Sequence, residues 1–375
     1  MEILNFIIPF IILLTVVVFV HEYGHYYFAK KYGVGVTDFS IGFGKEIFGF
    51  NDKSGTRWKF CVVPLGGYVK FFGDRNVFSQ AEQEELLKKY DKKDQQKLFV
   101  TKPLYQRSLI VLAGPVANFL LAILIFTFIY MFAGKDFTPA QINEVQINSP
   151  AQSAGIKSGD LIVSINDKKV SSILEVSAFI NTSSTENIKI KVLRNDNNID
   201  FLVTPELIKS EDSLGNKINK KIIGIKISPL NNELKRERLG PATAIFYAVK
   251  ETWFVTNASF DFVISLFKGK GDTTQLGGPI KIAKITGQVA KLGLIAFLSI
   301  MAYISISLGF INLFPIPMLD GGHLLFYAFE KVLGRPLSQK TQEGFFRIGL
   351  FLLVFLMLFT TINDLKDIGL FQDYF

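Results

Sequence analysis

Cysteine and histidine are both scarce in this chain, which has one cysteine, Cys61, and three histidines among 375 residues. A single cysteine excludes an intramolecular disulfide framework and a metal site built from several thiolates. The net charge is +8, yet no basic run is interleaved with aromatic residues in the way that nucleic-acid-binding segments require. We therefore expect no nucleic acid among the partners, and we expect the excess lysines on solvated and cytoplasmic faces.

Apolar residues, by contrast, are abundant and clustered. They make up 49% of the sequence, and the mean hydropathy of +0.30 is high for a soluble protein. Four clusters can cross ~30 Å of hydrocarbon as helices, so a lipid bilayer is the expected environment. The first cluster does not fit a signal peptide, because no basic residue precedes it and it runs into His21 without a small-residue cleavage site. The predicted transmembrane helices are residues 1–29, 107–133, 291–317 and 345–363.

The loop at residues 30–106 carries a different pattern. Gly, Phe and Val alternate between Val34 and Phe72, which predicts short strands and hairpins. A capping pattern at Ser79 and Glu82 predicts a charged helix later in the same loop. The expected fold class is thus a polytopic α-helical membrane protein with four transmembrane helices and a β region.

A small soluble domain is predicted at residues 138–206, between the second and third spans. Residues 148–166 contain a turn, a short helix ending at Gly155 and a strand. The extension at 207–290 contains an apolar segment, 242–267, that charged residues interrupt. This segment fits an amphipathic helix on the membrane surface better than a fifth span.

Basic residues predict the orientation in the membrane. Those beside the first two spans are Lys30, Lys31, Lys102 and Arg107, and others lie in the loop at 318–344. The positive-inside rule places both loops in the cytoplasm, with both termini and the small domain outside. Three lysines before the third span oppose this orientation, but they belong to a long translocated segment, where the rule is weak. They are Lys281, Lys284 and Lys291.

The segment from His21 to His25 has the form H-E-x-x-H. On a helix its two histidines share one face, so both can bind one Zn²⁺. Glu22 is then placed to accept a proton from the water that the metal activates. The segment lies at the end of an apolar span, where ionisable residues are functional by default.

Zinc needs a third protein ligand and one open position. We predict Asp320, which follows the third span in a segment whose prolines and glycines prevent a regular helix. Irregular backbone at membrane depth must be buried in protein or line a watery cavity. The structural alternative is an aspartate that caps the next helix. His323 is the rival ligand, for which we favour a hydrogen-bonding or packing role.

Two further segments are candidates for binding substrate. Asn312 could donate its amide to a substrate carbonyl or a developing oxyanion, or it could equally be a polar packing residue between helices. Gly42-Phe43-Gly44 could lie at a strand edge that binds an unwound substrate, although an ordinary turn is the simpler interpretation.

Taken in order, these motifs resemble the site-2 protease family, and specifically its bacterial RseP-like group. His21–His25 is similar to the zinc helix of that family, and Pro317–His323 to its L-D-G segment, whose aspartate is the third ligand. Residues 149–166 resemble its PDZ domain. The other matching segments are Gly42–Gly44 and Pro64–Phe71 of its membrane-associated β region, Ala113–Phe119, Leu276–Ile280 and Asn312–Pro317.

The resemblance implies a zinc-dependent metalloendopeptidase of the bacterial inner membrane. Its expected substrates are single-span membrane proteins, such as trimmed anti-sigma factors or remnant signal peptides, and its small domain is expected to be one extracytoplasmic PDZ domain. Some family members have two PDZ domains in tandem, so a role that needs two is in doubt here. The alternatives are a membrane-tethered zinc peptidase acting on soluble peptides, and a PDZ-containing membrane scaffold with a degenerate metal site.

Overall fold

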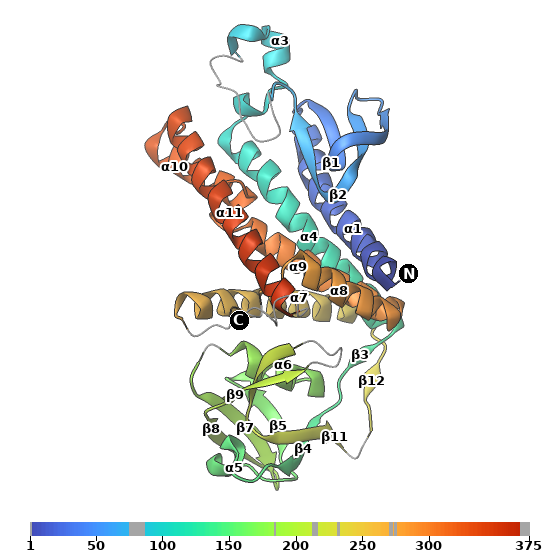
Figure 1. Cartoon of the computed structure of the whole chain (residues 1–375), viewed down its shortest axis with the longest axis vertical. Helices are drawn as coiled ribbons and strands as arrows, with labels where there is room; N and C mark the ends of the chain where they lie inside the picture. Colours follow the sequence, from blue (N-terminus) through green and yellow to red (C-terminus); the bar gives the residue numbers. More distant parts are fainter. Residues whose placement is uncertain are drawn as a thin grey trace. The chain divides into compact units, whose positions relative to one another are not determined.

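Figure 1 shows the computed structural model of the chain, which divides into two compact units. The first comprises Met1–Ile125 and Gly278–Ile362, and the second comprises Phe126–Gly277 and Asn363–Phe375. The charged helix expected from Ser79 lies outside the described residues. The structure describes residues 2–74, 87–183, 185–211, 217–230, 233–269, 273 and 276–367.

Four helices in the described part of the chain are long and apolar enough to cross a membrane, as predicted. The third is shorter than the expected 291–317, because Gly293 at its start has φ of 107° and prolines follow its end. The fourth is longer than the expected 345–363, because polar residues continue the helix at both ends. The four helices are α1 (Glu2–Lys31), α4 (Leu104–Phe132), α9 (Leu294–Asn312) and α11 (Gln339–Asp367).

Glycines allow three of these helices to pack closely. A Cβ on Gly24 of α1 would lie 2.3 Å from the carbonyl oxygen of Ala113 in α4. A Cβ on Gly309 of α9 would lie 3.0 Å from the carbonyl oxygen of Pro115, also in α4. Small residues are what lets membrane helices approach backbone to backbone. Shorter helices in this unit are α3 (Lys92–Gln95), a 3-10 turn (Phe99–Thr101), α8 (Pro279–Lys291) and α10 (Asp320–Leu333).

The loop after α1 forms one long antiparallel pair, β1 (Val36–Asn51) and β2 (Arg57–Phe71). Residues 38–41 of β1 have register partners in both halves of β2, at 57–60 and at 67–70. The strands therefore fold back on each other, where the sequence predicted separate short strands.

The bend in β1 coincides with Gly42 and Gly44, whose φ angles are 90° and 87°. This region of φ favours glycine. The bend in β2 follows Pro64, which lacks an N–H for the ladder. After these bends, residues 67–71 form an outer segment with no second neighbouring strand among the described residues.

The turn between β1 and β2 is held by Asp52. Its carboxylate accepts hydrogen bonds from the Tyr26 hydroxyl of α1 at 2.8 Å and from the Trp58 indole at 3.2 Å. It also accepts from the backbone N–H groups of Ser54 and Thr56. Tyr26 follows His25 directly, so this contact fixes the β pair beside the histidine helix.

The second unit contains a six-stranded sheet in the order β11-β4-β5-β7-β8, with β6 beside β5. Its core is rich in isoleucine and valine. The last strand lies outside the predicted range of 138–206, because it joins the sheet through a long-range antiparallel pairing with β4. The strands are β4 (Ala140–Val145), β5 (Leu161–Ile165), β6 (Lys168–Lys169), β7 (Ile188–Arg194), β8 (Asn197–Val203) and β11 (Ile225–Pro229).

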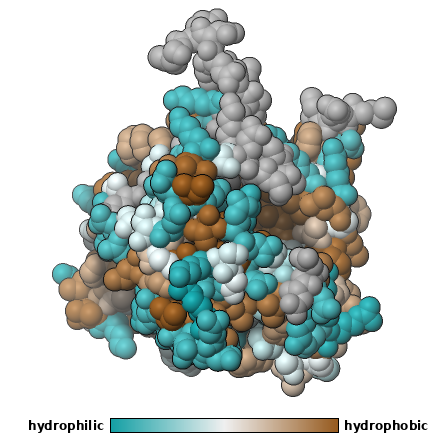
Figure 2. Space-filling model, turned by 90° about the horizontal axis from the view of Figure 1, so that it is seen from below, coloured by the Kyte–Doolittle hydropathy of each residue, from teal (hydrophilic) through white to brown (hydrophobic). Residues whose placement is uncertain are grey.

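Two helices accompany this sheet, α5 (Pro150–Ala154) and α6 (Ile173–Thr182). The first begins after the Ser149 cap and ends at Gly155 in the left-handed conformation, as the sequence predicted. Figure 2 views the molecule from the end where α5 lies in Figure 1, and hydrophilic residues there alternate with small hydrophobic patches. The remaining strands are β3 (Lys135–Asp136), β9 (Glu206–Glu211), β10 (Lys217–Ile222) and β12 (Arg236–Glu237).

The segment expected at 242–267 is a continuous helix, α7 (Pro241–Phe267). It is not among the helices apolar enough to cross a membrane. Its buried residues, Ala244, Ala248 and Thr252, recur every four positions and so lie on one side. This one-sided burial is that of a surface helix.

Candidate metal centre

α1 places His21 and His25 one turn apart, on the side that meets α4. Gly114 of α4 faces both rings. A Cβ on this glycine would lie 2.3 Å from Nε2 of His25 and 2.9 Å from Cε1 of His21. Any larger residue would displace the imidazoles, so glycine at 114 makes room for the histidine pair between the two helices.

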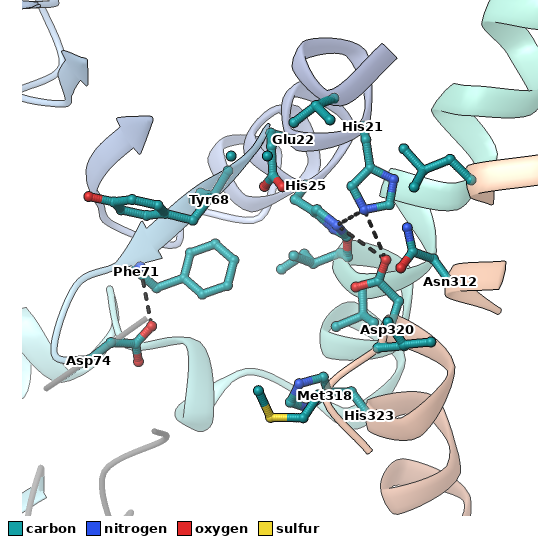
Figure 3. A pocket seen from close by; sticks show the side chains of 18 of the residues that line it. His21, Glu22, His25, Tyr68, Phe71, Asp74, Asn312, Met318, Asp320 and His323 are labelled. Carbon is teal, nitrogen blue, oxygen red and sulfur yellow. Dashed lines mark hydrogen bonds and ion pairs between the residues drawn. The ribbon is translucent and has the colours of Figure 1, made fainter. Parts of the chain in front are cut away.

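Asp320, the first residue of α10, completes a cluster with the two histidines (Figure 3). Its Oδ2 lies 3.1 Å from Nε2 of His21 and 3.5 Å from Nε2 of His25. The two Nε2 atoms are 3.2 Å apart. All three potential ligand atoms lie within 4.8 Å of one another, a spacing that one metal ion can bridge.

The other hydrogen bonds of this cluster leave room for a cation. Nδ1 of His25 lies 2.8 Å from the carbonyl oxygen of Ile110, which can only accept, so Nδ1 donates and Nε2 is free to bind metal. Nδ1 of His21 lies 3.2 Å from Nδ2 of Asn118. Oδ2 of Asp320 is buried without a hydrogen-bond partner among the described residues. A bound cation would satisfy that oxygen, and two imidazoles with one carboxylate are a donor set that suits zinc.

The capping alternative for Asp320 does not hold. Leu319 is the N-cap of α10, and the described residues show no side-chain capping bond at this helix start. The helix can begin here because glycines follow. A Cβ on Gly321 would lie 2.2 Å from the carbonyl oxygen of Phe314, and one on Gly322 would lie 2.4 Å from that of Ile316.

A cavity of about 650 Å³ opens beside the cluster, and helices α1, α4, α9, α10 and α11 line it together with β2. Glu22 is among its lining residues, together with Val69 of β2. A carboxylate one residue from a metal ligand and facing a cavity can accept a proton from an attacking water.

Sequence comparison decides the family. The model of peptidase family M50 matches residues 9–356 of this sequence. This chain belongs to peptidase family M50. Relatives named as candidate zinc metalloproteases include one of Mesorhizobium japonicum, 42% identical over 96% of this chain and 99% of its own length. Another, of Agrobacterium fabrum, is 40% identical over 97% and 96%. Metalloprotease MmpA of Caulobacter vibrioides is 34% identical over 98% and 96%.

The M50 family is the site-2 protease family of zinc-dependent membrane proteases, so the resemblance drawn from the motifs is confirmed. This protein is a bacterial membrane metalloprotease with zinc as its cofactor. The cavity beside His21, His25 and Asp320 is the candidate protease site of this chain.

Asn312, at the end of α9, lines this M50 cavity and lies near Asp320 and His21 in Figure 3. No side-chain hydrogen bond ties Asn312 to another helix in the described part of the chain. Its amide is thus available to a substrate group, which favours the first of the two roles considered for it. The role itself stays a prediction.

Gly42 and Gly44 do not line the cavity of this M50 site, although Phe43 does. The cavity wall is formed instead by the later half of β2, from Gly66 to Val69. A Cβ on Gly67 would lie 3.0 Å from Cγ of Glu22, so glycine allows this strand to approach the Glu22 side chain closely.

His323 lines the cavity but is not part of the three-residue cluster. Its ring centroid lies 5.6 Å from that of Phe346 in α11 and 6.4 Å from that of Phe326 in α10. These contacts agree with the packing role favoured for it.

Sequence reasoning matched Ala113–Phe119 of α4 to the family but assigned no role to Gly114 or Asn118 within it. Asn118 is fully buried and contacts His21, and Gly114 makes space for both rings. The available signal was a polar amide four residues after a glycine in an otherwise apolar span, since polar groups in membrane helices are costly unless bonded.

Proposed function

We propose that this protease hydrolyses single-span membrane proteins within the bilayer or at its edge, with zinc held by His21, His25 and Asp320. The observation that carries the proposal is the buried cluster of three ligand atoms within 4.8 Å, with an unpartnered carboxylate oxygen at its centre. The ligands come from α1 and from the start of α10, both next to apolar helices. This position favours a substrate in the membrane over a soluble peptide.

In this proposal the side chains around the cavity divide the chemistry. Zinc, when bound, polarises the scissile carbonyl and makes water more acidic near neutral pH. Glu22 accepts the proton of the attacking water and then delivers it to the leaving amine. Asn312 donates its amide to the carbonyl oxygen as negative charge develops there.

A transmembrane substrate must also unwind before its backbone can reach these groups. Backbone groups exposed in a bilayer cost several kcal/mol each if they stay unpaired. An extended segment could instead pair with the outer strand segment at 67–71, which lines the cavity beside Glu22. Gly42 and Gly44 then act by bending β1, which places that segment at the cavity.

The β pair is a candidate for contact with lipid, as the expected membrane-associated β region. Ile47, Phe48 and Val62 are 70%, 61% and 56% exposed, which is unusual for large apolar residues on strands that face water. We propose that the loop at 30–106 lies on the cytoplasmic side and that both termini lie outside, as the basic residues indicate.

The sheet of the second unit is the candidate PDZ domain. Its five-strand path, the sixth strand β6 and the helices α5 and α6 form one compact domain around a shared core. We assign it as a single extracytoplasmic PDZ domain that meets substrate tails outside the membrane. Substrates of this kind are trimmed anti-sigma factors and remnant signal peptides.

The decisive experiment compares membrane fractions from cells that contain the wild-type protein or Glu22→Gln. We expect short single-span fragments to accumulate with Glu22→Gln, because they are made but not cleaved further. Glu144→Gln, an exposed substitution on β4, serves as the matched control. Identical fragment populations for the wild type and Glu22→Gln would contradict intramembrane proteolysis.

A further inference from the structure

One face of α8 concentrates positive charge. Its three lysines and one glutamine recur at intervals of three and four residues, so they lie along one side of the helix. α8 contains no acidic residue. The buried Thr286 lies on the opposite side, and the buried Gly287 lies beside Lys284 and Lys291 at the edge of the lysine face. The residues of this lysine face are Lys281, Lys284, Gln288 and Lys291.

α8 lies where two spans begin. A Cβ on Gly287 would be 2.4 Å from the ring of Phe6 and 2.9 Å from the carbonyl oxygen of Asn5, both in the first turns of α1. Nζ of Lys291 is 5.2 Å from the centroid of the Phe6 ring. Only Leu292 and Gly293 separate α8 from the start of α9. A helix packed on the beginning of one span and joined to the beginning of another lies at the membrane boundary.

We propose that the lysine face of α8 binds the phosphate headgroups of anionic phospholipids in the leaflet where α1 and α9 begin. Lysine stems can extend along apolar surface while their ammonium groups reach the headgroups. Basic residues at a membrane boundary attract anionic lipid electrostatically. This also accounts for the three lysines that oppose the charge rule, because they lie on a surface helix rather than in a free loop.

The probe is dihexanoylphosphatidylglycerol, titrated into detergent-solubilised full-length protein while the thermal midpoint is followed. We expect saturable stabilisation, and we expect the apparent affinity to fall on the order of tenfold or more in K281Q/K284Q/K291Q. The matched control is K157Q/K169Q/K226Q, which removes three exposed lysines from the second unit and should bind like the wild type. K281R/K284R/K291R should also retain binding, and it keeps the test valid if the glutamine variant is unstable.

Two outcomes would overturn this proposal. Equal affinity of the wild type and K281Q/K284Q/K291Q for the phosphatidylglycerol would show that the lysine face does not bind it. Equal stabilisation by inorganic phosphate, or by dihexanoylphosphatidylcholine, would show that the anionic lipid is not the ligand.

A separate observation concerns Asn118. Its side chain is fully buried, Nδ2 lies 3.2 Å from Nδ1 of His21, and Oδ1 has no hydrogen-bond partner among the described residues. α9 fixes the position of this residue, because the Ser305 hydroxyl donates to its backbone carbonyl at 2.9 Å. An amide can present either its oxygen or its nitrogen to the same neighbour by rotating.

We infer that Asn118 is a positioning residue that selects the metal-binding tautomer of His21. When Nε2 of His21 binds zinc, Nδ1 must carry the proton and donate it. The amide of Asn118 then presents Oδ1, which has no other hydrogen-bond partner among the described residues.

Zinc affinity, measured by chelator competition on the full-length protein, tests this inference. Asn118→Leu, similar in size but without an acceptor, should bind zinc on the order of 10- to 100-fold more weakly. Asn118→Asp keeps the acceptor and should restore most of the affinity. Ser305→Ala is the control and should stay close to the wild type. Wild-type zinc affinity in Asn118→Leu, or equal losses in Asn118→Leu and Asn118→Asp, would overturn it.

Discussion

Asp320 in the first unit and Asp160 in the second are both shielded aspartates, but their surroundings differ in kind. The Asp160 carboxylate accepts from Nε and Nη2 of Arg194 at 2.6 and 2.7 Å and from the Lys157 backbone at 2.9 Å. Oδ2 of Asp320 has no hydrogen-bond partner within the described chain. The second unit thus neutralises its buried charge with an arginine, whereas the carboxylate of the first unit faces two imidazole nitrogens, a set of three ligand atoms that one cation can bridge.

The largest contrast is expected from cleavage by Glu22→Gln. Glutamine keeps the shape of the side chain but cannot accept a proton, so cleavage should fall by at least ~100-fold. Zinc content and folding should stay near wild type, because Glu22 is not a ligand. Cleavage by purified protein and metal analysis check both statements, and turnover within tenfold of wild type would mean that another group is the base.

Zinc content should separate the two aspartates directly. We expect about one Zn²⁺ per chain in the wild type and a large loss in Asp320→Asn and in His21→Ala, because each removes a ligand. Asp160→Asn should retain its zinc. Metal analysis of the purified variants measures this, and full retention in Asp320→Asn would remove Asp320 from the ligand set and promote His323.

The free energy of unfolding should show the reverse order, with a larger loss in Asp160→Asn than in Asp320→Asn. Asp160→Asn leaves the Arg194 guanidinium without its charge partner, so the second unit should lose ~1–3 kcal/mol of unfolding free energy. A denaturant titration, in which proteolysis of the second unit reports its unfolding, gives this value. Asp320→Asn in metal-free protein is the control, and a comparable loss there would contradict the distinction between the two sites.

Glycines at the bend of β1 test the link between the β pair and cleavage. Gly42→Val and Gly44→Val should weaken cleavage with normal zinc content, because valine disfavours the positive φ at both positions. Helix-breaking residues in the substrate span should partly restore cleavage, since they lower the cost of unwinding. Gly55→Val, with φ of 84° in the β1–β2 turn and open space around it, controls for strain alone. Wild-type cleavage by Gly42→Val and Gly44→Val would contradict the proposal that an unwound substrate pairs with the outer strand segment at 67–71.

The smallest effect concerns pH. Burial raises the pKa of Asp74, which lines the cavity, to about 7. The folded state then binds this proton more tightly than the unfolded state, so the stability that protonation contributes is lost as pH rises from ~4 to 7. Asp74→Asn should flatten that decline in thermal midpoints measured across this range.

The pKa of Asp160 is shifted in the opposite direction. Burial alone would raise this pKa, but the hydrogen bonds of Arg194 hold it below its usual value. Its contribution is therefore lost only on acidification below ~4.

The cluster of three potential metal ligands and the four apolar helices were accessible from sequence because their signals are local or strongly periodic. His21 and His25 are four residues apart, and Asp320 follows an apolar span within a recognisable break. The contribution of β2 was harder to predict, because the fold-back of 38–41 onto both halves of β2 depends on long-range pairing. The addition of β11 to the sheet was not predicted for the same reason, because it also depends on long-range pairing.

Asn118 illustrates a different limit. A polar residue in a predicted span indicates that a hydrogen-bond partner exists, but residue spacing alone does not predict which helix supplies that partner. Only the approach of α1 to α4 at Gly24 and Gly114 reveals that the partner is His21. Contacts between helices are therefore what turned a list of polar residues into a site.

The division of the first unit into two chain segments has a consequence for biosynthesis. His21 and His25 lie in the first helix to be made, whereas Asp320 is made only after all the strands of the second unit. A nascent chain thus carries two of the three proposed ligands and the proposed base, but it lacks the third proposed ligand until its final part has been inserted. Closing so long a loop costs entropy that the assembled helices and the metal must offset together. In this arrangement the order of synthesis delays activity. A partly synthesised copy in the membrane has no complete metal site and therefore cannot cleave neighbouring membrane proteins.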